Sequence, residues 1–170
     1  MRTDLVRLAG IAYESLVNGP GMRRVLFAQG CKHNCKGCFN PDTHDMQGGK
    51  MMNMDKIIDD IKNNPLISGV TFSGGDCLEQ ADKFAYMAKG VKELGLNVWC
   101  YTGYIYEYIL ENKDSRKGWE DLLNNIDVLV DGKFQKDKAD TNLKYIGSSN
   151  QRIIDIKESF KLGKVVTIEY

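Results

Sequence analysis

Three cysteines lie close together in the chain, at Cys31, Cys35 and Cys38. Their spacing, C-x3-C-x2-C, can supply three thiolates to three irons of a four-iron cluster. The fourth iron then lacks a protein ligand, and an open position on a bound metal is where a substrate can bind and react. The segment therefore predicts reaction chemistry at an iron–sulfur cluster, whereas a cluster closed by four cysteines would only store or pass electrons.

Zinc is an alternative occupant of this cysteine segment. A structural zinc ion takes four ligands, usually from two spaced pairs of residues, and the chain offers no second C-x2-C pair. His33, His44, Cys77 or Cys100 could supply a fourth ligand, so the zinc interpretation stays open. We nevertheless expect the two histidines to be solvated loop residues, Cys77 to be a non-ligating thiol and Cys100 to lie in the core.

Disulfide bonds, a c-type haem and a packed apolar core fit the cysteine segment poorly. The chain has five cysteines, an odd number, and its 170 residues need no disulfides for stability. A c-type haem requires C-x-x-C-H, whereas Phe39 follows Cys38. The residues between the cysteines are mostly polar or charged, which is typical of a loop.

A second candidate segment is Ser73-Gly74-Gly75-Asp76. Two adjacent glycines let a ligand approach the backbone closely. Their N–H and C=O groups could bind the amine and carboxylate of an amino acid, and Asp76 could pair with an ammonium group. Gly-Gly-Asp alone is most often a turn, so its position beside the cysteine segment carries the prediction. A phosphate-binding loop is excluded, because the chain contains no G-x-x-x-x-G-K-[ST].

The composition indicates an ordinary globular chain without general affinity for nucleic acid. Lys+Arg and Asp+Glu both number 23, whereas nucleic-acid-binding domains normally carry a basic excess. No apolar run approaches the ~20 residues that span a membrane, and residues 1–10 lack the apolar core of a signal peptide. We therefore expect a single domain over residues 1–170, with no membrane association, in the cytoplasm, where thiols stay reduced.

Short β-rich runs alternate with helical periodicity along the chain. The pattern predicts strands at 24–29, 69–72, 97–101, 126–130, 152–156 and 165–169, and helices at 54–63, 78–94, 104–111 and 119–124. Such alternation favours an α/β fold, and the chain is too short for an eight-unit barrel of ~250 residues. We expect a partial (β/α) barrel or an open, curved, mainly parallel sheet flanked by helices. Four loops that leave strands, at 30–40, 73–76, 101–104 and 131–134, should then surround one site.

These segments together resemble the radical S-adenosylmethionine superfamily, because C-x3-C-x2-C after one predicted strand is followed by Gly-Gly-Asp after the next. More narrowly, the chain resembles the anaerobic ribonucleotide reductase activating proteins. The supporting segments are Asn18-Gly19-Pro20-Gly21, the cysteine segment with Asn40, Ser73-Gly74-Gly75-Asp76, Tyr101-Thr102-Gly103-Tyr104, Val128-Leu129-Val130-Asp131-Gly132-Lys133-Phe134 and Gly147-Ser148-Ser149-Asn150-Gln151-Arg152. Two positions depart from the pattern: Cys77 stands where the family often has proline, and Gly37 where the superfamily often has an aromatic residue.

The resemblance implies two cofactors and assigns residues to each. A [4Fe-4S] cluster would be ligated by Cys31, Cys35 and Cys38, and S-adenosyl-L-methionine would bind at its open iron. The residues expected to contact S-adenosyl-L-methionine are Gly74, Gly75 and Asp76 at the methionine end, and Gly37, Cys38 and Phe39, through their backbone, at the adenosine end. No general acid or base is expected, because the cofactors carry the hard chemistry.

The resemblance also implies the reaction and the partners. Reductive cleavage of S-adenosyl-L-methionine would give a 5′-deoxyadenosyl radical, which would take a hydrogen atom from a glycine of the large catalytic subunit of anaerobic ribonucleoside-triphosphate reductase. A flavodoxin-like protein would donate the electron. The alternatives are an activator of another glycyl radical enzyme, a non-catalytic iron–sulfur electron-transfer protein and a zinc-stabilised binding module. The segment 147–152 could dock the reductase or form a plain turn, and Tyr104 could reach the site.

Overall fold

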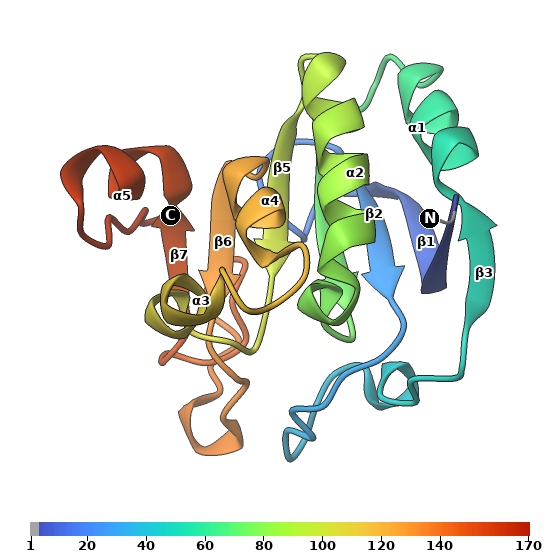
Figure 1. Ribbon diagram of the computed structural model, residues 1–170. Helices are drawn as coiled ribbons and strands as arrows, with labels where there is room; N and C mark the ends of the chain where they lie inside the picture. Colours follow the sequence, from blue (N-terminus) through green and yellow to red (C-terminus); the bar gives the residue numbers. More distant parts are fainter. Residues whose placement is uncertain (1–3) are drawn as a thin grey trace.

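The computed structural model describes residues 4–170, in which seven strands form one sheet in the order β3-β1-β2-β4-β5-β6-β7 (Figure 1). The strands are β1 (Leu5–Ser15), β2 (Arg23–Ala28), β3 (Lys50–Asn53), β4 (Gly69–Gly74), β5 (Asn97–Tyr101), β6 (Val128–Asp131) and β7 (Arg152–Asp155). The four central strands, β2, β4, β5 and β6, run parallel, and β1, β3 and β7 add antiparallel pairings at the two sides. The end strands β3 and β7 do not pair, so the sheet is open rather than a closed barrel, which confirms the predicted fold class.

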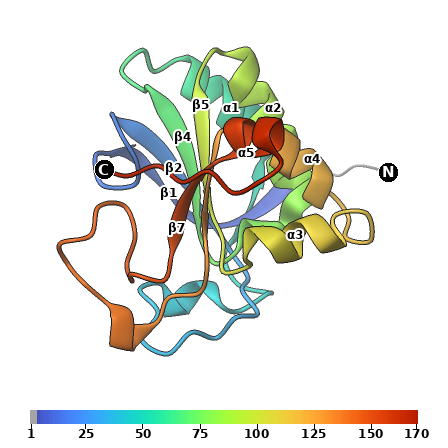
Figure 2. The same cartoon turned by 90° about the vertical axis from the view of Figure 1, so that its left-hand side faces the viewer.

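Helices pack against one face of this sheet, as Figures 1 and 2 show. They are α1 (Met54–Lys62), α2 (Ala81–Glu93), α3 (Tyr106–Asn112), α4 (Trp119–Asn124) and α5 (Ile156–Leu162), and short 3₁₀ turns occupy Pro41–Thr43, Cys77–Gln80 and Lys136–Lys138. The buried face of α2 packs on the central strands, where the rings of Phe84 and Phe72 meet edge to face at 4.9 Å. Burial of this apolar face supplies the driving force that holds the helix on the sheet.

The opposite face of the central strands carries a smaller apolar cluster. Trp99, Val128, Val130 and Ile153 are buried there, with Tyr145 packed against them. Figure 2 shows the long loop after β6 on this side of the sheet, away from the helices. The smaller apolar cluster and the loop after β6 thus lie on the side of the sheet opposite the helices.

The structure confirms most of the predicted elements within one or two residues and corrects others. The predicted strand at 165–169 is wrong, because only an isolated bridge between Thr167 and Ile154 forms there. Among the strands and α-helices of the described residues, β1, β3 and α5 were not predicted. The predicted strand at 152–156 ends earlier, because the Asp155 side chain accepts a hydrogen bond from the Glu158 N–H (3.0 Å) and begins α5.

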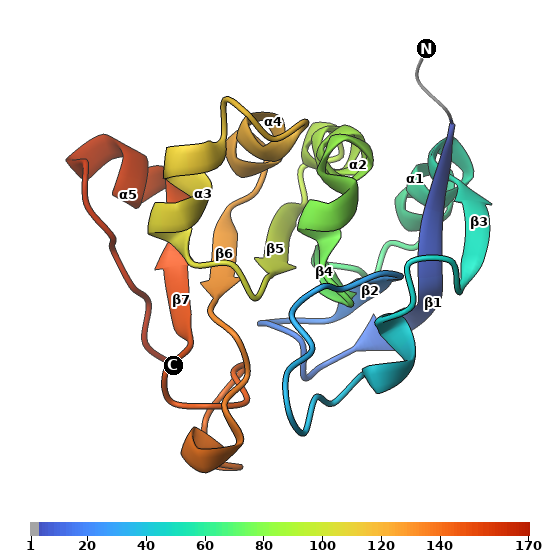
Figure 3. The same ribbon diagram turned by 60° about the horizontal axis from the view of Figure 1, so that its bottom comes forward.

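The loops that follow the parallel strands meet at one edge of the sheet. Figure 3 shows the cysteine segment and the loop after β6 at this same end of the molecule. Carboxyl ends of parallel strands are where α/β proteins usually place their ligands. Among the described residues, no helix has the length and apolar character needed to cross a membrane.

Candidate active site

A cavity of about 940 Å³ opens at the carboxyl edge of the central strands. All four predicted loops contribute to its wall, which includes Cys31, Cys35, Cys38, Phe39, Ser73, Gly74, Gly75, Tyr101, Thr102, Gly103, Gly132, Lys133 and Phe134. The parallel order of β2, β4, β5 and β6 explains this convergence, because the loop of each strand begins at the same edge. The structure thus brings most of the predicted site residues together around one space.

The three cysteines of the triplet are half-buried free thiols that face this cavity. Burial raises the pKa of the Cys31 thiol to about 11, although a hydrogen bond from the backbone N–H of His33 opposes the shift. Burial also raises the pKa of Cys35, against a backbone hydrogen bond from Phe134. A bound metal reverses this preference, because coordination favours the thiolate strongly.

One sulfur of the triplet accepts a hydrogen bond from the backbone: the Asn40 N–H donates to Cys38 Sγ (3.4 Å). Hydrogen bonds of this kind help to set the reduction potential of iron–sulfur clusters. In the described part of the chain, no three His, Cys, Asp or Glu side chains converge on a point that could hold one metal ion. A cluster does not require that convergence, because each thiolate binds a different iron.

The cavity wall also contains a buried polar atom without a partner. His44, expected to be solvated, lines the cavity, and its Nε2 atom is buried without a hydrogen bond among the described residues. A buried polar atom of this kind is costly unless something satisfies it. The chemistry of the wall therefore fits a polar ligand held beside a cluster.

The double glycine is required by close contact between two loops. A side chain at Gly74, where φ is +95°, would place its Cβ 2.6 Å from the Ala28 nitrogen, and one at Gly75 would lie 2.4 Å from the Gly30 oxygen. The Gly75 N–H donates to the Ala28 oxygen and the Asp76 N–H to the Gly30 oxygen, both at 2.8 Å. These hydrogen bonds join the glycine loop, residues 73–76, directly to the start of the cysteine segment. Both glycines line the cavity.

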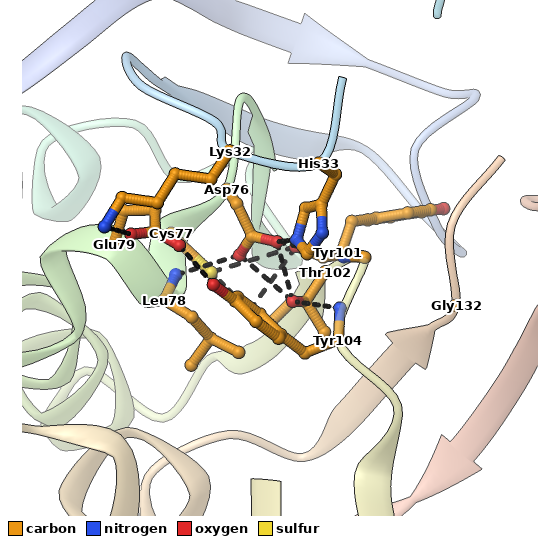
Figure 4. A network of polar contacts seen from close by, with 12 residues as sticks. Lys32, His33, Asp76, Cys77, Leu78, Glu79, Tyr101, Thr102, Tyr104 and Gly132 are labelled. Carbon is orange, nitrogen blue, oxygen red and sulfur yellow. Dashed lines mark hydrogen bonds and ion pairs between the residues drawn. The ribbon is translucent and has the colours of Figure 1, made fainter. Parts of the chain in front are cut away.

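Asp76 is fully buried, and its carboxylate is engaged by protein groups (Figure 4). It accepts hydrogen bonds from the Leu78 N–H (3.0 Å), the Thr102 hydroxyl (2.9 and 3.0 Å) and the Gly103 N–H (2.9 Å), and it contacts the Nε2 atom of His33 at 2.6 Å. A ligand ammonium would have to displace one of these groups. The predicted contact between Asp76 and a ligand stays a prediction.

His33 is the residue that sequence reasoning missed. It was expected in solvent, yet its side chain is only 7% exposed and ends on the buried carboxylate of Asp76. Its neighbour Tyr104 does not line the cavity: the Tyr104 hydroxyl donates to Glu79 (2.5 Å), and its ring packs edge to face on His33. The available signal was a histidine between two predicted ligand cysteines, which alone does not identify its partner.

The segment 147–152 supports the loop after β6. The Gln151 side chain accepts hydrogen bonds from the Gly147 and Ser148 N–H groups and donates to the Gly132 oxygen (3.0 Å). Gly147 in turn lies against the ring of Phe39, which packs on Phe134 with centroids 4.8 Å apart. These contacts give the segment an internal structural role beside the cysteine segment.

The remaining two cysteines do not line the cavity. Cys77 and Cys100 are fully buried, and their sulfur atoms lie 2.7 Å apart behind the glycine loop. Burial, together with the neighbouring Cys100 thiol, holds the pKa of Cys77 well above its ordinary value. The structure thus places Cys77 in a buried thiol pair and Cys100 in the core.

Comparisons with known proteins agree with this cysteine-lined site. Residues 17–154 match the family model described as a 4Fe-4S single cluster domain. Three relatives carry the name anaerobic ribonucleoside-triphosphate reductase-activating protein. The relative from Vibrio cholerae is 40% identical, covering 81% of this chain and 90% of its own length. The relative from Enterobacteria phage T4 is 34% identical, covering 81% and 86%, and that from Escherichia coli is 37% identical, covering 80% and 90%. The chain therefore belongs to the family of anaerobic ribonucleoside-triphosphate reductase-activating proteins.

Proposed function

We propose that this protein reductively cleaves S-adenosyl-L-methionine at a [4Fe-4S] cluster and generates a glycyl radical on anaerobic ribonucleoside-triphosphate reductase. The observation that carries the proposal is the shared cavity, in which three cysteines of one loop face the backbone of a double glycine from the next strand. The names of the relatives supply the reductase as the partner.

Cys31, Cys35 and Cys38 would hold the cluster and leave one iron open to the cavity. A reduced cluster there would supply the one electron that splits S-adenosyl-L-methionine into methionine and a 5′-deoxyadenosyl radical, which would take a hydrogen atom from the target glycine to give 5′-deoxyadenosine and a glycyl radical. The protein's share is to bind, orient and exclude water. A flavodoxin-like donor would replace the electron.

The two walls of the cavity would hold the two ends of S-adenosyl-L-methionine. Gly74 and Gly75 offer close backbone approach for the methionine end, with Asp76 directly behind them. The backbone at residues 37–39, of which Cys38 and Phe39 line the cavity, would contact the adenosine end. The cavity, at about 940 Å³, lies at the upper end of the ~300–1,000 Å³ range that is usual for small-molecule sites.

The reductase would complete the site from outside. Val17 and Phe39 line the cavity, yet they are 76% and 72% exposed. Large apolar side chains at a cavity mouth are typical of a surface that a partner covers. A glycine-bearing loop of the reductase inserted here would bring the target hydrogen to the cavity and shield the radical from water.

The test compares cysteine variants after anaerobic reconstitution. Replacing Cys31, Cys35 or Cys38 by alanine should abolish both the iron–sulfur absorbance and the formation of 5′-deoxyadenosine, whereas the buried Cys100→Ala control should keep both. With the reductase present, 5′-deoxyadenosine should form in step with a glycyl radical seen by electron paramagnetic resonance. Cleavage at equal rates with and without the reductase, and no glycyl signal, would mean that the substrate is different.

A further inference from the structure

We propose that Asp76 is a positioning residue, which acts through the ring of His33 to fix the conformation of the cysteine segment. The proposal deepens the proposed function, and it rests on that function only for the identity of the cluster. It differs from a direct contact between Asp76 and S-adenosyl-L-methionine, because it assigns the carboxylate a partner within the protein. Figure 4 shows the residues concerned.

His33 connects the cysteine segment to the rest of the site. It lies between Cys31 and Cys35 in the chain, and its Nε2 atom is 2.6 Å from the Asp76 carboxylate. The ring packs edge to face on Tyr104, with centroids 4.4 Å apart. A buried hydrogen bond to a charged group is among the stronger contacts that a side chain can make, so this ring is an anchor for the segment.

The carboxylate that receives His33 is itself held rigidly. Two backbone N–H groups and the Thr102 hydroxyl bind it from the loops that follow β4 and β5. Thr102 is fixed in turn, because its Oγ1 atom also accepts a hydrogen bond from the Tyr104 N–H (3.1 Å). The Asp76 side chain therefore cannot turn toward the cavity without breaking its hydrogen bonds to the loops that follow β4 and β5.

A second contact joins the same two loops one residue earlier in the cysteine segment. Lys32 lies 3.4 Å from Glu79, which also accepts the hydroxyl of Tyr104. The Lys32 side chain is 64% exposed, and pairs that exposed contribute little to stability. Lys32 therefore provides a matched control beside His33.

His33 also lies two residues from each of two predicted cluster ligands, Cys31 and Cys35. Its ring binds Asp76, so the backbone between these cysteines is held at the buried carboxylate. One residue thus links the buried carboxylate to a predicted cluster ligand. If the ring is released, the backbone between the two cysteines loses this anchor, and the hydrogen bonding and solvent exposure of their sulfurs, which help to set a cluster's potential, change.

The first experiment uses the reduced apoprotein and needs no cluster. Amide hydrogen exchange of residues 30–38 should be about ten-fold or more faster in His33→Ala and in Asp76→Asn, from the usual strength of a hydrogen bond to a charged group. The effects of the two changes should be clearly less than additive in the double variant, because each change removes the same contact between His33 and Asp76. Lys32→Ala should match the wild type. Unchanged exchange in His33→Ala, or additive effects in the double variant, would overturn the proposal.

The second experiment separates positioning from direct binding in the reconstituted protein. If Asp76 acts through His33, both variants should lower iron retention and shift the midpoint potential of the cluster in the same direction. His33→Gln, which keeps a donor for Asp76, should restore iron retention at least in part. If Asp76 instead binds the ligand, Asp76→Asn alone would weaken S-adenosyl-L-methionine binding, and His33→Ala would leave it intact. If the proposed function is wrong, the wild-type protein will not cleave S-adenosyl-L-methionine. The hydrogen-exchange result does not depend on that outcome, because it is measured on the apoprotein.

Discussion

Gly103 is the position where one added carbon should displace His33. A Cβ there would lie 2.6 Å from His33 Cδ2, 2.7 Å from Nε2 and 2.8 Å from Cγ, whereas unbonded carbon atoms prefer ~3.5–4.0 Å. The ring would have to move by roughly 0.7–1 Å. It has no easy direction to move, because Asp76 holds one end and Tyr104 covers a side.

The expected cost of Gly103→Ala follows from two opposing effects. Overpacking a filled site usually costs ~1–3 kcal/mol. Gly103 does not adopt a positive φ, so alanine adds no backbone strain and recovers ~0.4–1 kcal/mol by restricting the unfolded chain. The net loss should be about 1–2 kcal/mol, or about 2–8 °C in the melting temperature of a chain this long.

Urea unfolding of the reduced apoprotein measures this loss, and iron content after reconstitution reports the cysteine segment. The matched control is Gly10→Ala, because a Cβ at Gly10 meets nothing within 4 Å; its free energy of unfolding should be unchanged or slightly raised. In a His33→Ala background, Gly103→Ala should lose its penalty, since the ring it strikes is gone. A penalty that persists there would refute the reasoning.

Three further predictions concern buried groups. Iodoacetamide should alkylate Cys77 and Cys100 in the native apoprotein far more slowly than the other thiols by mass spectrometry, because both are fully buried. Burial raises the pKa of Cys31 from 9.0 to about 11, so the folded apoprotein favours the thiol form. The stability that this shift contributes is fully present below pH 9 and is lost as the pH rises through about 11. Urea titrations across this range should show that fall, and Cys31→Ala should reduce it. Trp119→Phe should cost ~1–3 kcal/mol in the same assay, because the buried Leu78 oxygen loses its indole donor at 3.0 Å.

The periodic spacing of apolar residues predicted those helices and strands that bury one regular face. Helix α1 is an example, because Met54, Ile57 and Ile61 are buried at helical spacing and Asn53 caps its first turn. Strand β1 was not predictable in the same way. It is eleven residues long, yet only two of its side chains are buried, and its register with β2 shifts at two places. An irregular strand of this kind leaves no clean alternation in the sequence.

The meeting of the cysteine and glycine loops was predictable from topology, because parallel neighbours β2 and β4 end at the same edge. The pairing of His33 with Asp76 was not. It depends on the directions of two side chains in irregular loops that are 43 residues apart, and no period relates such directions to the sequence. Composition also pointed the wrong way, because histidine in a polar segment ordinarily indicates solvent.

The two glycines and the aspartate of Gly-Gly-Asp face different parts of the molecule. The glycines are forced by the approach of residues 28–30, and their backbone faces the cavity. The next residue donates its own N–H to the Gly30 oxygen, and its buried side chain lies behind the cavity wall among donors from the loops after β4 and β5. The same turn that opens the backbone to a ligand therefore places Asp76 under the cysteine segment. Asp76 therefore acts first on the conformation of the cysteine segment, and any effect on ligand binding follows from the position of that segment.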